Sequence, residues 1–91
     1  DPCSLRIHAP GATVMQIARG LDAAYAALAG TDPREAAQAA FDREGWDVQG
    51  FRVEDWPPDE TFRLAELWDE AQHAVVEACG EEASVSVVWP G

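Results

Sequence analysis

The chain has 91 residues, and its 17 acidic residues against six arginines and no lysine give a formal net charge of −11. A chain of this length is expected to form one domain, spanning residues 1–91. The negative field excludes direct binding to nucleic acid or to anionic membranes, and no apolar run approaches the roughly 20 residues that cross a bilayer.

The negative charge is concentrated after Gly45. Residues 1–45 contain six acids and four arginines, whereas residues 46–91 contain eleven acids and two arginines. A GC-rich coding bias or a salt-adapted proteome would produce such a composition without any functional meaning. A surface that meets a basic partner would produce it as well, and the sequence leaves both explanations open.

The first predicted elements are a short strand and a long amphipathic helix. Residues 3–8 alternate between apolar and polar side chains, which predicts a half-buried strand. Residues 13–29 place apolar side chains three and four positions apart, which predicts a helix with Thr13 as its N-cap. Gly20 lies inside this helix, where glycine costs about 1 kcal/mol relative to alanine. A close packing contact is therefore expected at Gly20.

A second helix is predicted over residues 33–44. Asp32 is its expected N-cap, Pro33 takes the first helical position, and Gly45 is expected to end it. Small residues on its inward side predict close packing against the first helix, in an αα-hairpin. These inward residues are Ala36, Ala37, Ala40 and Phe41.

The C-terminal half is predicted to alternate strand, helix and strand. Residues 46–54 are expected to be extended, with a bend at Gly50. A third helix follows over residues 59–79, because acidic residues open it and apolar residues recur at helical spacing up to Gly80. Residues 83–89 alternate strictly and predict the last strand.

Together these elements predict an α+β fold with the order β-α-α-β-α-β. We expect a two-layer α/β sandwich built on a three-stranded sheet. Its helices should cover one face only, because the predicted strands alternate between apolar and polar side chains. If the last two strands are parallel, their connection should cross over with a right hand.

One face of the third predicted helix carries ionisable side chains at spacings of four, three and four. Two of them form a Glu-x-x-His pair, which in di-metal helical bundles supplies half of a metal site. The sequence contains no second such pair, so we predict a solvated face, no bound metal and no cofactor. The residues of this face are Glu66, Glu70, His73 and Glu77.

Nucleophilic catalysis is not predicted. Cys3 and Cys79 match no zinc or redox spacing, and we expect free thiols. The alternative is a disulfide, which would imply export. A Cys–His pair would need His8 beside Cys79, since His73 lies about one and a half helical turns away from the thiol. No phosphate-binding loop or Ser/His/Asp grouping is present, so no catalytic residue is assigned.

We therefore predict a non-enzymatic protein-interaction module whose acidic C-terminal half contacts a basic surface on a partner protein. Inhibitors and nucleic-acid mimics are special cases of this class. Trp56 is the candidate anchor, because tryptophan is enriched at binding hot spots; the alternative is that it caps the core. The predicted partner-binding residues are Glu54, Asp55, Trp56, Asp59, Glu60, Glu66 and Glu70.

The rival hypothesis is a small enzyme or ligand-binding subunit with a pocket between the helices and the sheet. A closed apolar pocket containing His8 or Cys79 would favour this rival. We expect a cytoplasmic protein, and we leave export open because the chain starts at Asp1 rather than at methionine. Repulsion between highly charged copies predicts a monomer or a weak dimer.

Overall fold

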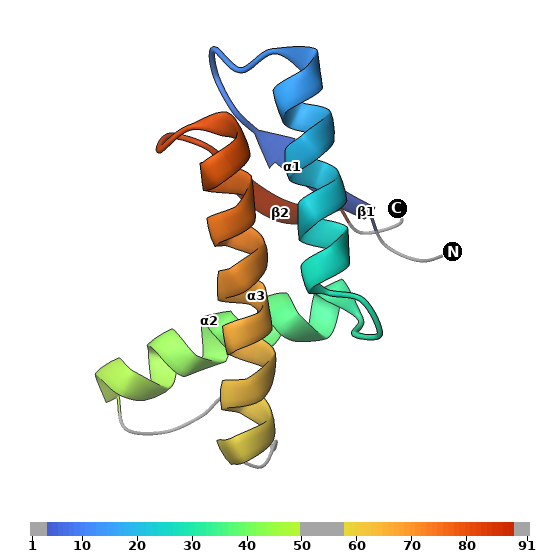
Figure 1. Cartoon of the computed structure of the whole chain (residues 1–91). Coiled ribbons are helices and arrows are strands. Elements are labelled where there is room, and N and C mark those ends of the chain that lie inside the picture. The colour runs from blue at the N-terminus through green and yellow to red at the C-terminus, as the bar shows by residue number, and fades with distance from the viewer. Residues whose placement is uncertain (1–3, 50–57, 89–91) are drawn as a thin grey trace.

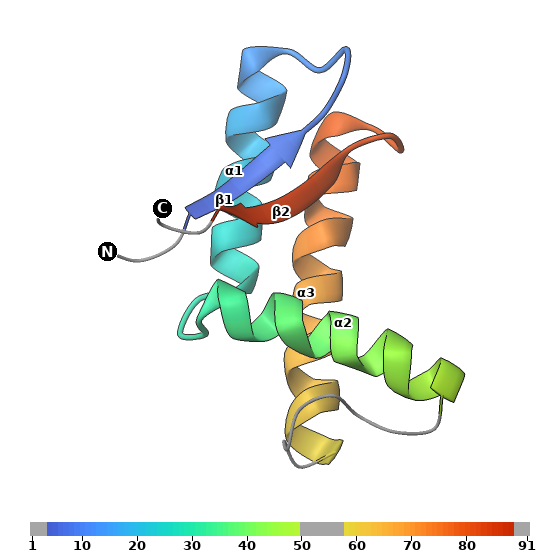
Figure 2. The same ribbon diagram turned by 180° about the vertical axis from the view of Figure 1, so that it is seen from behind.

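The computed structural model of the chain describes residues 4–49 and 58–88. In this part of the chain, two strands flank three helices in the sequence. The elements are β1 (Ser4–His8), α1 (Val14–Ala27), α2 (Pro33–Gln49), α3 (Pro58–Cys79) and β2 (Ser84–Val88). Figures 1 and 2 show that α1 and α3 lie side by side, with the two strands and α2 on the same side of this pair.

The fold is α+β, as expected, but the predicted three-stranded sheet and the order β-α-α-β-α-β are wrong. The observed order is β-α-α-α-β, and the described residues form a two-stranded antiparallel sheet of β1 and β2. In the register, Leu5 lies opposite Val87 and Ile7 lies opposite Val85. The first and last elements therefore pair with each other, and no right-handed parallel crossover arises.

The error in the sheet comes from the segment after Gly45. Instead of ending there, α2 continues through Gly45 to Gln49, so residues 46–49 are helical; residues 50–54 lie outside the described residues. Glycine costs only about 1 kcal/mol in a helix interior. Each added residue keeps one backbone hydrogen bond when no proline removes the donor. Gly45 is therefore too weak a signal to end the helix.

The predicted start of α2 is confirmed. The Asp32 carboxylate accepts a hydrogen bond from the Arg34 backbone N–H at 3.0 Å, and the Asp32 carbonyl accepts one from the Glu35 N–H. Pro33 is the first helical residue, where the missing backbone N–H is not needed. Ala36 and Ala39 are fully buried, but α2 packs mainly against α3 and not against α1, so the predicted αα-hairpin is wrong. Phe41, which we predicted to face inward, is exposed.

The start of α1 is confirmed as well, and it includes a capping box. The Gln16 N–H donates to the Thr13 hydroxyl at 3.1 Å, and the Thr13 N–H donates back to Gln16 Oε1 at 2.8 Å. The two bonds satisfy backbone donors that a helix start leaves unpaired.

The close packing contact that the sequence predicts at Gly20 is confirmed, and it involves β1 and α3. A Cβ atom at this position would lie 3.1 Å from Cys79 Sγ, 3.2 Å from Ile7 Cδ1 and 3.5 Å from Ala78 Cβ. The absence of a side chain therefore lets three elements meet at one point.

The core is built largely from small residues. One cluster joins both strands to the three helices, and a second lies between α2 and α3. Trp68 packs against both clusters and so connects them. Alanine adds little apolar area, but it lets helices approach closely, so the buried Leu and Val side chains supply most of the hydrophobic stabilisation. The larger buried apolar residues are Leu5, Leu28, Leu64, Val75 and Val85.

The predicted facing of both strands is confirmed. Leu5 and Val85 are buried, whereas Ser4, Arg6 and Ser86 are exposed, so the outer face of the sheet is polar apart from the exposed Val88. None of the described helices combines the length and the apolar character needed to cross a membrane.

Candidate functional site

The acidic stripe predicted on the third helix lies on the solvent side of α3. Glu66, Glu70, His73 and Glu77 are all exposed, while Leu64, Ala71 and Val75 on the opposite side are buried. Asp59 at the start of the helix is exposed as well. Just over three turns separate Asp59 from Glu70, about 16 Å along the axis. The predicted binding residues therefore form a line along α3 instead of a compact cluster.

Two ion pairs between described residues of α3 involve the acidic side chains of this helix. The Arg63 guanidinium donates to the Glu60 carboxylate, with Nη2 and Oε1 2.7 Å apart. This hydrogen bond, more than the opposite charge, lowers the pKa of Glu60 and raises that of Arg63. His73 Nε2 lies 3.1 Å from Glu77 Oε1. Glu60 is thus already bound within the helix, which weakens its case as a contact for a partner.

The remaining predicted residues, Glu54, Asp55 and Trp56, lie outside the described residues. Among those described, Asp59, Glu66 and Glu70 have no ion-pair partner and stay available at the surface. The structure therefore keeps three of the seven predicted residues as exposed, unneutralised carboxylates.

The structure does not bring metal ligands or a nucleophile and base together within the described residues. No group of three or more His, Cys, Asp or Glu side chains there is placed to hold a metal ion. His73 pairs with Glu77 rather than with Glu70. Cys79 donates to the Gln16 carbonyl oxygen across 3.3 Å, while His8 lies on the exposed face of the sheet; Cys3 is outside the described part.

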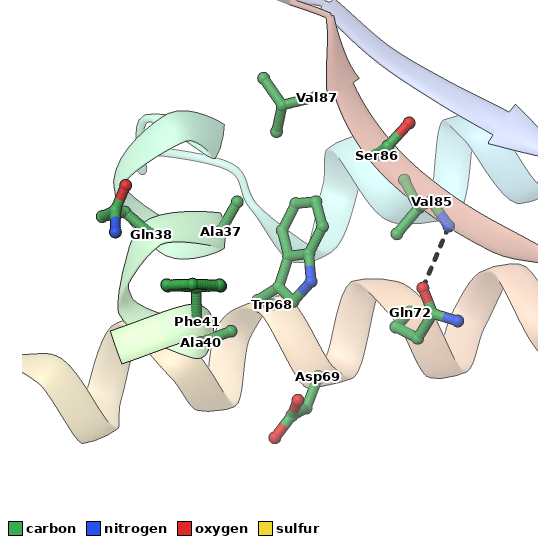
Figure 3. Close-up of a pocket in the computed structure, with 10 residues that line it drawn as sticks. All are labelled: Ala37, Gln38, Ala40, Phe41, Trp68, Asp69, Gln72, Val85, Ser86 and Val87. Carbon is green, nitrogen blue, oxygen red and sulfur yellow. Dashed lines mark hydrogen bonds between the residues drawn. The ribbon is translucent and has the colours of Figure 1, made fainter. Parts of the chain in front are cut away.

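An open pocket lies between α2, α3 and β2 (Figure 3). The rival hypothesis expected a pocket between the helices and the sheet, but the sequence did not identify the residues that line it. Its volume is about 630 Å³, within the usual range for ligand pockets. Trp68 points from α3 into the space between α2 and the strand, and Phe41 closes the side formed by α2. The described residues that line it are Ala37, Gln38, Ala40, Phe41, Trp68, Asp69, Gln72, Val85, Ser86 and Val87.

The side-chain amide of Gln72 binds the backbone at the edge of β2, beside this pocket, through both its nitrogen and its oxygen. Its Nε2 donates to the Ala83 carbonyl at 3.3 Å, and its Oε1 accepts from the Val85 N–H at 3.0 Å (Figure 3 shows the second bond). One residue of a neighbouring parallel strand would offer the same two groups, its N–H as the donor and its C=O as the acceptor. The Gln72 amide therefore fills the positions of the N–H and C=O of one residue of a third strand.

The free side of β2 follows from the register. Antiparallel residue pairs alternate between those that exchange hydrogen bonds and those whose N–H and C=O groups point outward. The Leu5 N–H donates to the Tyr25 hydroxyl at 2.9 Å, so the pair of Leu5 and Val87 is of the outward kind. The Val87 N–H and C=O and the Val85 C=O therefore point away from β1, and no hydrogen bond to another described group satisfies them.

The one signal in the sequence that could have indicated this edge is Gln72 itself. It follows the buried Ala71 and precedes the buried Val75, so it lies at the border of the apolar stripe of α3. A polar residue at such a position needs a hydrogen-bond partner. The sequence does not say that the partner is the backbone of β2, because that contact depends on the packing of distant segments.

Comparison with known proteins adds no family or neighbour to this description. No family model matches the chain, and neither the curated proteins nor the solved structures contain a significant match.

Gln72 offers a direct test of the contact between helix and strand. We expect Gln72→Met, which keeps the length of the side chain, to lower the free energy of unfolding by about 1–2 kcal/mol, because it leaves the Ala83 carbonyl and the Val85 N–H without partners. Urea denaturation followed by circular dichroism measures the change. Equal stability of the variant and the wild type would contradict the assigned role.

Gln72→Glu tests the donor and the acceptor separately. The carboxylate can still accept from the Val85 N–H but places a second oxygen against the Ala83 carbonyl. Only the protonated form restores the donor, so folding should raise the pKa of the introduced Glu. The variant should therefore lose stability relative to wild type as pH rises from about 4 to 7. A pH-independent difference would contradict this assignment.

Proposed function

We propose that this chain is a non-enzymatic protein-interaction module whose acidic C-terminal half binds a basic surface on a partner protein. The observation that carries the proposal is the line of exposed carboxylates on α3. Asp59, Glu66 and Glu70 face solvent without a neutralising partner among the described residues. Glu81 and Glu82 extend the acidic surface into the turn before β2.

The chemistry of the pocket favours this proposal over the rival enzyme. The rival would gain support from a closed pocket that contains His8 or Cys79, and neither is among its described lining residues. Asp69 is the only ionisable side chain in that lining. A general acid–base pair or an activated nucleophile needs at least two groups within hydrogen-bond reach. The described lining therefore supports binding better than catalysis.

Electrostatic binding makes a kinetic prediction. Proteins captured by the immobilised chain from an extract of its source cells are identified, and the association rate of the purified partner is measured from 0.05 to 0.5 M salt. We expect the rate to fall about tenfold or more over this range, because opposite charges steer the encounter and salt screens them. A rate that does not respond to salt would overturn the proposal.

A matched pair of variants locates the charge effect on α3. Glu66→Gln with Glu70→Gln removes two charges from the proposed surface. Asp22→Asn with Glu35→Gln removes two charges from exposed positions on α1 and α2. The first pair should slow association about threefold or more and the second much less, since local charge dominates steering. Equal effects would mean that net charge alone acts, without a binding surface on α3.

A further inference from the structure

We propose that the outer edge of β2 and the adjoining pocket bind an extended segment of the partner, which adds to the sheet as a third strand. The segment carries an apolar side chain that enters the pocket between Phe41 and Trp68, and basic side chains at neighbouring positions. This inference rests on the proposed function, because it assigns the basic partner a binding mode.

The edge of β2 offers hydrogen bonds that the described part of the molecule does not use. The Val85 C=O and the Val87 N–H and C=O all point away from β1. A strand laid along this edge could form three backbone hydrogen bonds with these groups. Strand addition of this kind takes its affinity from main-chain bonds and its specificity from pockets for alternate side chains.

The two edges of the sheet differ in their protection. On β1, the Tyr25 hydroxyl of α1 accepts the Leu5 N–H at 2.9 Å, so a helix covers part of that edge. Proteins usually protect free edges with charged residues, proline or bulges. Within β2, the sequence Ser-Val-Ser-Val-Val contains no charged residue and no proline. The register of β2 against β1 is continuous, without a bulge.

Gln72 shows where an incoming strand would begin. Its amide binds the Ala83 C=O and the Val85 N–H, which precede the open groups along β2. An antiparallel strand would place one residue opposite Val87, where its N–H and C=O bind the C=O and N–H of Val87, and the residue opposite Val85 would donate to the Val85 C=O. The open groups of the edge therefore begin where the contact with Gln72 ends.

The pocket indicates which kind of side chain the added strand should carry on the side that faces it. Successive residues of a strand point to opposite faces, so one residue of the added strand faces the pocket and its neighbours face away. Phe41 is 66% exposed at the pocket, although it is a large apolar side chain. Covering it with an apolar side chain of the segment would remove this area from water, at a gain of about 25 cal/mol per Å².

The negative charge around the edge of β2 favours a basic partner over a second copy of the chain as the strand that binds there. Residues 58–88, which form α3 and β2, contain eight acids and one arginine. An added strand with arginine or lysine beside its apolar residues would complement this field, whereas a second copy would bring its own charge of −11. The occupant that fits both the edge and the field is thus a basic, extended peptide.

The probe for the test is a labelled peptide of alternating arginine and valine, six residues long and blocked at both ends. We expect it to bind the full chain in fluorescence anisotropy and to slow amide hydrogen exchange at Val87 about tenfold or more, because the added strand protects that N–H. A version with N-methylated valines cannot donate these backbone bonds and should bind more weakly. Equal binding of the two peptides would overturn strand addition.

Two variants with the same starting exposure locate the pocket. Phe41 and Met15 are both 66% exposed, but only Phe41 lines the pocket. Phe41→Ala should raise the dissociation constant of the arginine–valine peptide about fivefold or more, while Met15→Ala should leave it unchanged. Circular dichroism should show both variants folded, because each side chain is mostly exposed. An equal response of the two variants would overturn the role of the pocket.

The remaining outcomes separate this inference from the proposed function. If the peptide perturbs the amides of Glu66 and Glu70 but not those of Val85 and Val87, binding at the acidic surface is supported and strand addition is overturned. If a glutamate–valine peptide binds equally well and protects Val87, strand addition is supported, but the proposal that the partner is basic is overturned. Protection of Val87 without peptide in a dimer seen by light scattering would assign the edge to self-association. A peptide that does not bind at all would overturn both.

Discussion

Replacing Gly20 with leucine is expected to lower the free energy of unfolding by about 2–3 kcal/mol. The first added atom alone would lie 3.1 Å from Cys79 Sγ and 3.2 Å from Ile7 Cδ1. The three further carbons of leucine would have to enter the same contact, so α1 must move away from α3 and β1. Urea denaturation of the variant and the wild type measures the loss.

Gly20→Ala is the matched control for this prediction. It adds only Cβ, which requires shifts of a few tenths of an ångström at Ile7 and Cys79. It also gains about 1 kcal/mol of helix propensity, which offsets this strain. The alanine variant should therefore remain within about 1 kcal/mol of the wild type. If leucine is tolerated as well as alanine, the close contact at Gly20 does not limit packing.

Replacing Val75 with alanine is expected to cost about 2–3 kcal/mol, because the fully buried side chain leaves a void that the core refills only in part. The same substitution at Val14 removes a side chain that is 83% exposed and should change the stability by less than about 0.5 kcal/mol. Denaturation of the two variants under the same conditions measures the difference. Similar losses at both positions would contradict the placement of the core.

These stability predictions are independent of the binding experiments. The side chains that we assign to binding, such as Glu66, Glu70 and Phe41, are exposed and contribute little to the core. Gly20 and Val75 lie inside the fold, away from the acidic line of α3. Loss of binding in the first group and loss of stability in the second can therefore be measured separately.

The separation of the molecule into a core side and an acidic side could be predicted from the sequence. Helical spacing alone places Glu66 and Glu70 opposite Leu64 and Val75 on one helix. The capping residues Thr13 and Asp32 are equally local, because the side chain of each bonds a backbone N–H no more than three residues away. Such features depend on short stretches of chain, and the structure confirms them.

The strand pairing and the pocket could not be predicted from the sequence, because both depend on the tertiary structure. Trp46 and Val48 are spaced as in a strand, but α2 continues to Gln49 because local hydrogen bonds outweigh the cost of Gly45. With that segment helical, β2 has β1 as its neighbour on one side and the Gln72 amide on the other. The pocket arises because α2, α3 and β2 converge around Trp68. Spacing within a single element encodes none of these contacts, since each joins residues that only the packing of the whole chain brings together.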